Sequence, residues 1–225
     1  MKEQRFRHEL KHDINYFDCM ELISRLQYIA KPDDHASADG SYKIRSLYFD
    51  NLYDKALREK INGVSNREKF RIRYYNGDTS YIRLEKKSKR SGLCQKQSAS
   101  ISKAQCQMLL NGKIDFLKES SEILFLELYA KIRAEQLRPK NIVDYKRHAF
   151  VFPAGNVRVT IDSDIRTSSN ITQFLDPLLV CHSPTKSIIL EVKYDDFLPQ
   201  VIADIIQLSN RQRNAFSKYA ISRIL

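Results

Sequence analysis

One segment of the chain, NREKFRIRYY, alternates between basic residues and residues that are mostly apolar. Every second position holds a cation: Arg67, Lys69, Arg71 and Arg73. Because successive side chains of a β-strand point to opposite faces, this spacing places all four cations on one face of a strand. Their apolar neighbours, Phe70 among them, share the other face. An ordinary half-buried strand needs no such row of cations, so the pattern requires a physical explanation.

The same alternation recurs in other segments that read as strands. Their charged or polar face contains Arg83, Glu85, Lys87 and Lys89; Arg5, Arg7, Glu9 and Lys11; Tyr145 and Arg147; Arg158, Thr160, Asp162 and Asp164; and Glu191 and Lys193. Neighbours on one face lie about 6.6 Å apart, so at an effective dielectric of about 20 each like-charged pair costs about 2.5 kcal/mol. A solvated face explains any single strand. Several such strands, with more cations than anions, indicate that a bound anion offsets the repulsion.

The overall charge also indicates a polyanionic partner. Among 225 residues, 38 are Lys or Arg and 27 are Asp or Glu, which gives +11. The segment 67–103 alone holds eleven basic and three acidic residues. Nucleic acid, anionic lipid and phosphorylated small molecules are all candidates. Trp is absent, and the cations keep a period of two instead of lying beside stacking aromatics, which argues against nucleic acid. Most Tyr and Phe residues share the apolar parity, so we expect them to pack in the core.

Hairpins with helices between and after them predict an α+β fold built on an antiparallel sheet. We expect strands over 5–14, 42–49, 67–75, 79–89, 141–152, 156–164 and 187–194, and helices over 16–30, 53–61, 102–110, 119–135, 198–208 and 215–224. The sequence NGD between two of the strands is typical of a tight hairpin turn. No linker divides the chain, so residues 1–225 are expected to form a single domain. A sheet curled into a barrel would turn the charged faces inward, around a basic tunnel, and the apolar faces toward surrounding helices.

The few acids with the inward parity suggest a metal. Polyphosphorylated ligands bring Mg²⁺ or Mn²⁺ with them, and these ions prefer one or two carboxylates plus phosphate oxygens. Glu191 is the first candidate ligand. Glu9, Glu85, Asp162 and Asp164 share its parity, but for each of them a structural ion pair with a tunnel cation is an equal alternative.

Eight motifs in chain order resemble one known family: RHELKH, SLYFDN, REKFRIRYYNGD, LEKKSK, DYKRHAF, TIDSDIR, LEVKYDD and FSKYAISRI. Together they are similar to the VTC domain, the polyphosphate polymerase branch of the triphosphate tunnel metalloenzymes (CYTH-like superfamily). The resemblance implies an antiparallel β-barrel tunnel flanked by helices. It also implies a metal-dependent transfer of the terminal phosphate of ATP, or of another nucleoside triphosphate, onto a growing polyphosphate chain.

The resemblance assigns roles to individual residues. The phosphate-binding cations of the family fall on Lys11, Arg71, Arg73, Lys87, Arg147 and Lys218, and its metal-binding glutamate falls on Glu191. Glu9 and Glu85 are weaker metal candidates. The remaining cations with inward parity are expected to bind phosphate along the tunnel: Arg7, Arg67, Lys69, Arg83, Lys89, Arg158 and Lys193.

One position departs from the wider superfamily. Triphosphatase and cyclase relatives begin with Glu-x-Glu-x-Lys, whereas this chain has Arg7, Glu9 and Lys11. Losing one carboxylate favours the polymerase over the two-metal hydrolase. A triphosphatase on the same fold and a non-catalytic polyphosphate-binding module stay open as alternatives.

Location and partners follow from what the sequence lacks. The first residues are charged, with no apolar signal core, and no apolar run approaches the roughly 18 residues that span a bilayer. We therefore expect a cytoplasmic protein. The eukaryotic polymerase subunits also carry membrane helices and a phosphate-sensing domain. Any coupling to translocation would here need a membrane partner protein.

Overall fold

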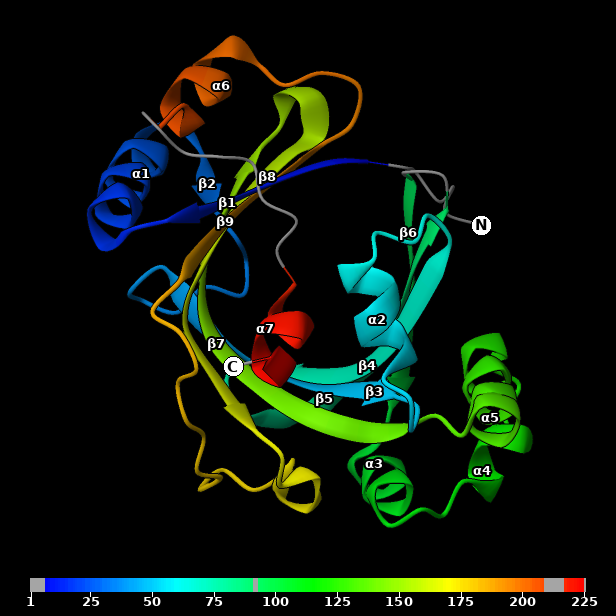
Figure 1. Cartoon of the computed structure of the whole chain (residues 1–225). Helices are drawn as coiled ribbons and strands as arrows, with labels where there is room; N and C mark the ends of the chain where they lie inside the picture. The colour runs from blue at the N-terminus through cyan, green and yellow to red at the C-terminus, as the bar shows by residue number, and fades with distance from the viewer. Residues whose placement is uncertain (1–6, 91–92, 209–216, 225) are drawn as a thin grey trace.

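The computed structural model describes residues 7–90, 93–208 and 217–224, in which an antiparallel sheet curls around a central space (Figure 1). Its strands are β1 (His8–Ile14), β2 (Lys31–Pro32), β3 (Ser41–Asp50), β4 (Arg67–Tyr75), β5 (Asp78–Arg90), β6 (Leu93–Ile101), β7 (Arg138–Phe152), β8 (Val157–Ser168) and β9 (Ile188–Tyr194). The strand order is β1-β9-β8-β7-β3-β4-β5-β6, and the short β2 pairs with β7. The predicted curled antiparallel sheet flanked by helices is confirmed.

Seven α-helices accompany the sheet in the described part of the chain. They are α1 (Tyr16–Ile29), α2 (Lys55–Ile61), α3 (Lys103–Leu110), α4 (Asp115–Lys118), α5 (Ile123–Glu135), α6 (Gln200–Ile206) and α7 (Lys218–Ile224). In Figure 1, α1 and α6 lie outside one end of the sheet, α3, α4 and α5 lie outside the other, and α2 and α7 lie within its curve. None of these helices combines the length and the apolar character that a membrane crossing requires.

The β4–β5 hairpin forms where the alternation and the NGD turn predicted it. Asn76 and Gly77 both have positive φ, 50° and 75°, as the tightest hairpin turns require. The register pairs Lys69 with Lys87 and Arg71 with Glu85, which places these four charged side chains on one face. The hairpin therefore carries the predicted basic face.

Apolar residues of the convex face form two separate clusters with the outer helices. One is formed by strands β3, β4, β5 and β6 and helices α3, α4 and α5, around Ile72 and Leu84. The other joins β1, β8 and β9 with α1 and α6 around Leu22 and Val159. These fully buried side chains carry most of the hydrophobic stabilisation, at roughly 1.5–3 kcal/mol for each fully buried large aliphatic residue.

The interior of the curve is not basic throughout, contrary to the expected tunnel. A third buried cluster joins the concave face to α2 and α7 and contains Ile44, Tyr48, Tyr145 and Tyr219. Its anchor is the fully buried Asp50, which accepts hydrogen bonds from the first turn of α2 and from the Tyr219 hydroxyl at 2.6 Å. The two inner helices thus fill one part of the concave side and leave the rest for the charged residues.

Several element boundaries differ from the expectation. Strand β6 was not predicted, because its sequence LCQKQSASI has a weak apolar alternation; it forms by pairing along β5. In β8, a bulge opposite Tyr145 gives Asp164 a φ of 50° and turns it outward to pair with Arg166. The predicted inward parity of Asp164 is therefore wrong. Residues 5–6 and 215–216, placed in the first strand and last helix, lie outside the described ranges.

The Tyr219–Asp50 contact predicts a stability loss. Tyr219→Phe removes one hydrogen bond to a buried carboxylate and should lower the free energy of unfolding by about 1.5–3 kcal/mol. Chemical denaturation monitored by circular dichroism measures this change. Tyr81→Phe, at a residue that is 50% exposed, is the matched control and should have little effect. Equal stability of the two variants would show that Asp50 does not anchor α7.

Candidate active site

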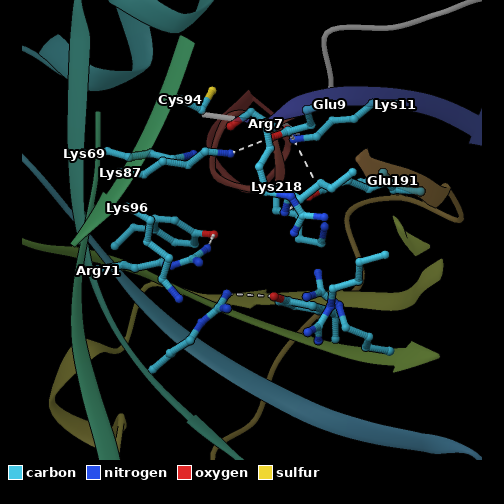
Figure 2. A pocket seen from close by; sticks show the side chains of 18 of the residues that line it. Arg7, Glu9, Lys11, Lys69, Arg71, Lys87, Cys94, Lys96, Glu191 and Lys218 are labelled. Atoms are coloured by element: carbon cyan, nitrogen blue, oxygen red, sulfur yellow. Dashed lines mark hydrogen bonds and ion pairs between the residues drawn. The ribbon is translucent and has the colours of Figure 1, made fainter. Parts of the chain in front are cut away.

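The concave face holds a cavity of about 620 Å³ with a strongly basic lining. Eleven Lys or Arg side chains and two carboxylates line it, contributed by strands on both sides of the curve and by the first residue of α7. Figure 2 shows many of these side chains converging from different strands on the same space. Such an excess of positive charge in one cavity favours the binding of a polyanion.

All six cations that the resemblance assigned to phosphate line this cavity: Lys11, Arg71, Arg73, Lys87, Arg147 and Lys218. Four of the further candidates join them: Arg7, Lys69, Arg158 and Lys193. The structure thus brings together residues that are up to about two hundred positions apart in the chain.

Three predicted phosphate-binding residues do not lie in the cavity lining. The Arg67 guanidinium donates to the Val64 carbonyl at the start of β4, and Arg83 donates to Ser98 and Ser100 on β6. Lys89 lies near the end of β5, opposite Arg67. The alternation correctly assigns a face to such residues, but the strands are longer than the cavity.

Two carboxylates meet across the β1–β9 pair. The Lys11 ammonium contacts Glu9 and lies 3.3 Å from Glu191, which is directly opposite Lys11 in the register. The Lys87 ammonium reaches Glu9 from β5 at 2.8 Å, and Lys193 contacts Glu191. Among the described residues no strand pairing joins β1 to β5, so the Lys87–Glu9 ion pair links the strand at one end of the curled sheet to the strand next to the other end.

Both carboxylates are ionised at neutral pH. Burial and the neighbouring Glu191 raise the pKa of Glu9, but Lys11, Lys87 and Lys193 outweigh them and lower it to about 2. Burial likewise opposes ionisation of Glu191, and the surrounding lysines hold its pKa well below the usual range. The pair is therefore a charged donor set for a cation.

Two lysines are poorly compensated. Burial, together with the positive charges of Lys87 and Arg71, holds the pKa of Lys69 well below its usual range. Within the described ranges no carboxylate pairs with Lys69, and its ammonium lies 5.6 Å from the Tyr48 ring centre. Burial also lowers the pKa of Lys193, to about 8, although Glu191 raises it. An anion in the cavity would restore the charged form of both.

Glu85 is the centre of a different cluster. Its carboxylate lies 2.6 Å from Arg71 and 2.6 Å from Lys96. It lies 3.7 Å from Nε of Arg73, a buried nitrogen that has no hydrogen-bond partner among the described atoms. The cluster fixes Arg71 and leaves a donor of Arg73 unused. Lys96 was missed because β6 was not recognised as a strand.

Asp162 organises the opposite wall. This fully buried carboxylate accepts two hydrogen bonds from Arg147, at 2.6 and 2.7 Å, and contacts Lys218. Burial raises its pKa, but Arg147 and Lys218 lower it to about 2. The charged Asp162 therefore holds an arginine from β7 and a lysine from α7 side by side at the cavity.

Buried tyrosines pack in the core as expected, but several of them also line the cavity. Tyr42, Tyr48, Tyr75 and Tyr145 line the cavity, together with His35 from the loop before β3. The signal was present in the sequence, because Tyr145 shares the parity of Arg147, and Tyr75 that of Arg73.

The charged pair of Glu9 and Glu191 fits a divalent metal, since Mg²⁺ is typically held by one or two carboxylates and phosphate oxygens. The described residues contain no cluster of three acidic, His or Cys side chains that would hold the ion alone. Glu85 fits less well, because it is not among the residues that line the cavity.

The low pKa of Lys193 and Lys69 predicts proton uptake on anion binding. Inorganic tripolyphosphate should favour their charged forms, so binding at about pH 9 should take up protons and weaken as the pH rises above about 8. Calorimetry in two buffers of different ionisation enthalpy measures the uptake. It should decrease in Lys193→Met and persist in Lys103→Met, at an exposed helix start. Binding without proton uptake would contradict the inferred titration.

Comparisons with known proteins agree with this geometry. A structure from Bacillus halodurans, described as a putative adenylate cyclase, is similar over 84% of this chain and 81% of its own (14% identity, TM-score 0.52). A putative adenylyl cyclase from Hippeastrum, described as having a dominant triphosphatase activity, is similar over 97% of this chain and 95% of its own (13% identity, TM-score 0.58). These likenesses show a shared fold.

No functionally curated protein matches the sequence. The family model of the VTC domain, however, matches residues 6–224. The chain therefore belongs to the VTC domain family.

Proposed function

We propose that this protein is a metal-dependent phosphotransferase that moves the terminal phosphate of a nucleoside triphosphate, such as ATP, onto a growing polyphosphate chain. Membership of the VTC domain family and the shared fold support a triphosphate-related activity. The observation that carries the proposal is the 620 Å³ cavity, in which eleven basic side chains surround a pair of ionised carboxylates. Linear phosphoanhydrides have the charge density that this lining requires.

The cations divide into two chemical kinds. Arg71, Arg73 and Arg147 present planar guanidinium groups that bind two phosphate oxygens at once. Lys11, Lys87 and Lys218 act as compact point charges, each held at the cavity by an ion pair with a carboxylate. Glu85 and Asp162 hold Arg71 and Arg147 in place, so the guanidinium groups are oriented before a ligand arrives. Such preorganisation is the main protein contribution to phosphoryl transfer.

The transfer step needs no protein nucleophile. A terminal oxygen of the polyphosphate chain attacks the γ-phosphorus, and the bond from that phosphorus to the β–γ bridging oxygen breaks. The electron pair leaves with the nucleoside diphosphate. The arginines and lysines neutralise the charge on the transferred group throughout. Glu9 and Glu191 would hold the divalent cation, which supplies charge neutralisation on the phosphate oxygens when it is bound.

A triphosphatase is the second candidate. It uses the same cavity, with water in place of the phosphate chain end, and a similar fold occurs in the Hippeastrum protein described as a triphosphatase. Against it, Arg7 occupies the position of one carboxylate of the hydrolase motif and pairs with Asp195. A non-catalytic polyphosphate-binding module would show the same affinity without turnover.

A product assay separates the three candidates. The purified protein incubated with ATP and Mn²⁺ should form long polyphosphate, visible on a stained gel, together with one nucleoside diphosphate for each phosphate added. A strong chelator should abolish the product. Release of orthophosphate alone would instead identify a triphosphatase, and binding without any product would identify a binding module.

Replacing the carboxylate opposite Lys11 tests the metal role. Glu191→Gln should lower kcat at least roughly 100-fold, above the range seen for outer partners of a bound metal. It should preserve or strengthen tripolyphosphate binding, because a negative charge leaves the cavity. Glu122→Gln, at an exposed glutamate before α5, is the control. Full activity of Glu191→Gln would exclude Glu191 as a metal ligand.

A further inference from the structure

We propose that His35, Tyr42 and Tyr75 form a stacking site for the nucleobase of the phosphate donor, at one end of the basic cavity. The inference rests on the proposed function, and it names the part of the substrate that the phosphate-binding cations cannot recognise. All three side chains line the same cavity as the cations.

The three rings form one cluster. The His35 and Tyr75 rings are stacked, with centroids 5.7 Å apart and planes inclined by 20°. The Tyr42 ring is edge-on to His35, with centroids 6.3 Å apart, and tilted by 58° relative to Tyr75, with centroids 6.0 Å apart. The nearly parallel pair offers the outer faces of its two rings, and bases stack on such aromatic faces.

The cluster lies in line with the phosphate-binding cations. Tyr75 shares its strand face with Arg73 and Arg71, and successive residues on one face are about 6.6 Å apart. The Arg73 guanidinium lies 5.8 Å from the Tyr75 ring centre. Lys69, which is paired with Lys87 in the register, lies at the other end of this row of side chains on β4. A triphosphate held by Arg71 and Arg73 would therefore have its sugar and base toward Tyr75.

The cluster is supported and accessible. The His35 amide donates to Asp33 at 3.1 Å, Asp33 pairs with Arg158 at 2.6 Å, and Arg158 donates to the Tyr42 hydroxyl. His35 itself is exposed and Tyr75 is half-buried. Core packing alone does not explain an exposed imidazole stacked on a cavity-lining tyrosine.

The consequence is a distinction between the two phosphate ligands. A nucleoside triphosphate would gain the stacking contact, whereas polyphosphate has no base and would be held by charge alone. Stacking is tolerant of base identity, so the site would favour nucleotides as a class.

The test compares ATP with inorganic tripolyphosphate by calorimetry, with metal chelated so that no turnover occurs. His35→Ala should weaken ATP binding by roughly 5- to 100-fold, the range for loss of one base–aromatic stack. Tripolyphosphate binding should not change. Tyr75→Leu should behave like His35→Ala, and Tyr75→Phe like the unchanged protein. His182→Ala, at an exposed histidine outside the cavity lining, is the matched control.

The outcomes separate this inference from the proposed function. If the unchanged protein binds both ligands equally, or if His35→Ala leaves ATP binding intact, the stacking site is wrong and the proposed function stands. Equal weakening of both ligands by His35→Ala would show that His35 acts on the phosphates, and this too would overturn the stacking site. If the unchanged protein binds neither ligand, the proposed function itself fails.

Discussion

Repulsion between cations that share the concave face of one curled sheet is the constraint on which this structure depends. Three groups of buried carboxylates reduce it, each by tying together cations from different elements. Glu85 joins β4 to β6, Asp162 joins β7 to α7, and the Glu9–Glu191 pair joins β1 to β9 and β5. The compensation is incomplete, because the pKa of Lys69 stays well below its usual range. In the proposed function, a bound polyanion would complete it.

The two apolar clusters of the convex face are separate from the cavity, whereas the third cluster shares Tyr48 and Tyr145 with the cavity lining. Two apolar clusters stabilise the convex face, and a third, anchored by Asp50, holds α7 against the concave face. This separation allows the cavity to keep unfavourable charges. By holding α7, Asp50 also positions Lys218, the first residue of that helix. The third cluster therefore contributes both to the stability of the fold and to the proposed phosphate binding.

Some features of the site were readable from residue spacing and others only from resemblance. The period-two alternation identified the cavity-facing cations of β4, and Glu191 and Lys193 of β9, because a strand fixes the face of each residue. Lys218 had no such signal in the sequence; the resemblance to a family supplied it. Lys96 was missed, since β6 has weak alternation. Of the cavity tyrosines only Tyr145 was placed on the charged face, because an aromatic residue fits either face.

The sequence by itself determined the faces, because side-chain parity is a local property of an extended backbone. It thereby determined a basic concave surface and the antiparallel hairpins that carry it. Tertiary structure alone decided how far the cavity extends along each strand, which excludes Arg67, Arg83 and Lys89 from its lining. It also decided the outward turn of Asp164, since a bulge is set by pairing with a neighbouring strand. Curvature, register and helix docking depend on contacts between distant segments, and no local pattern encodes them.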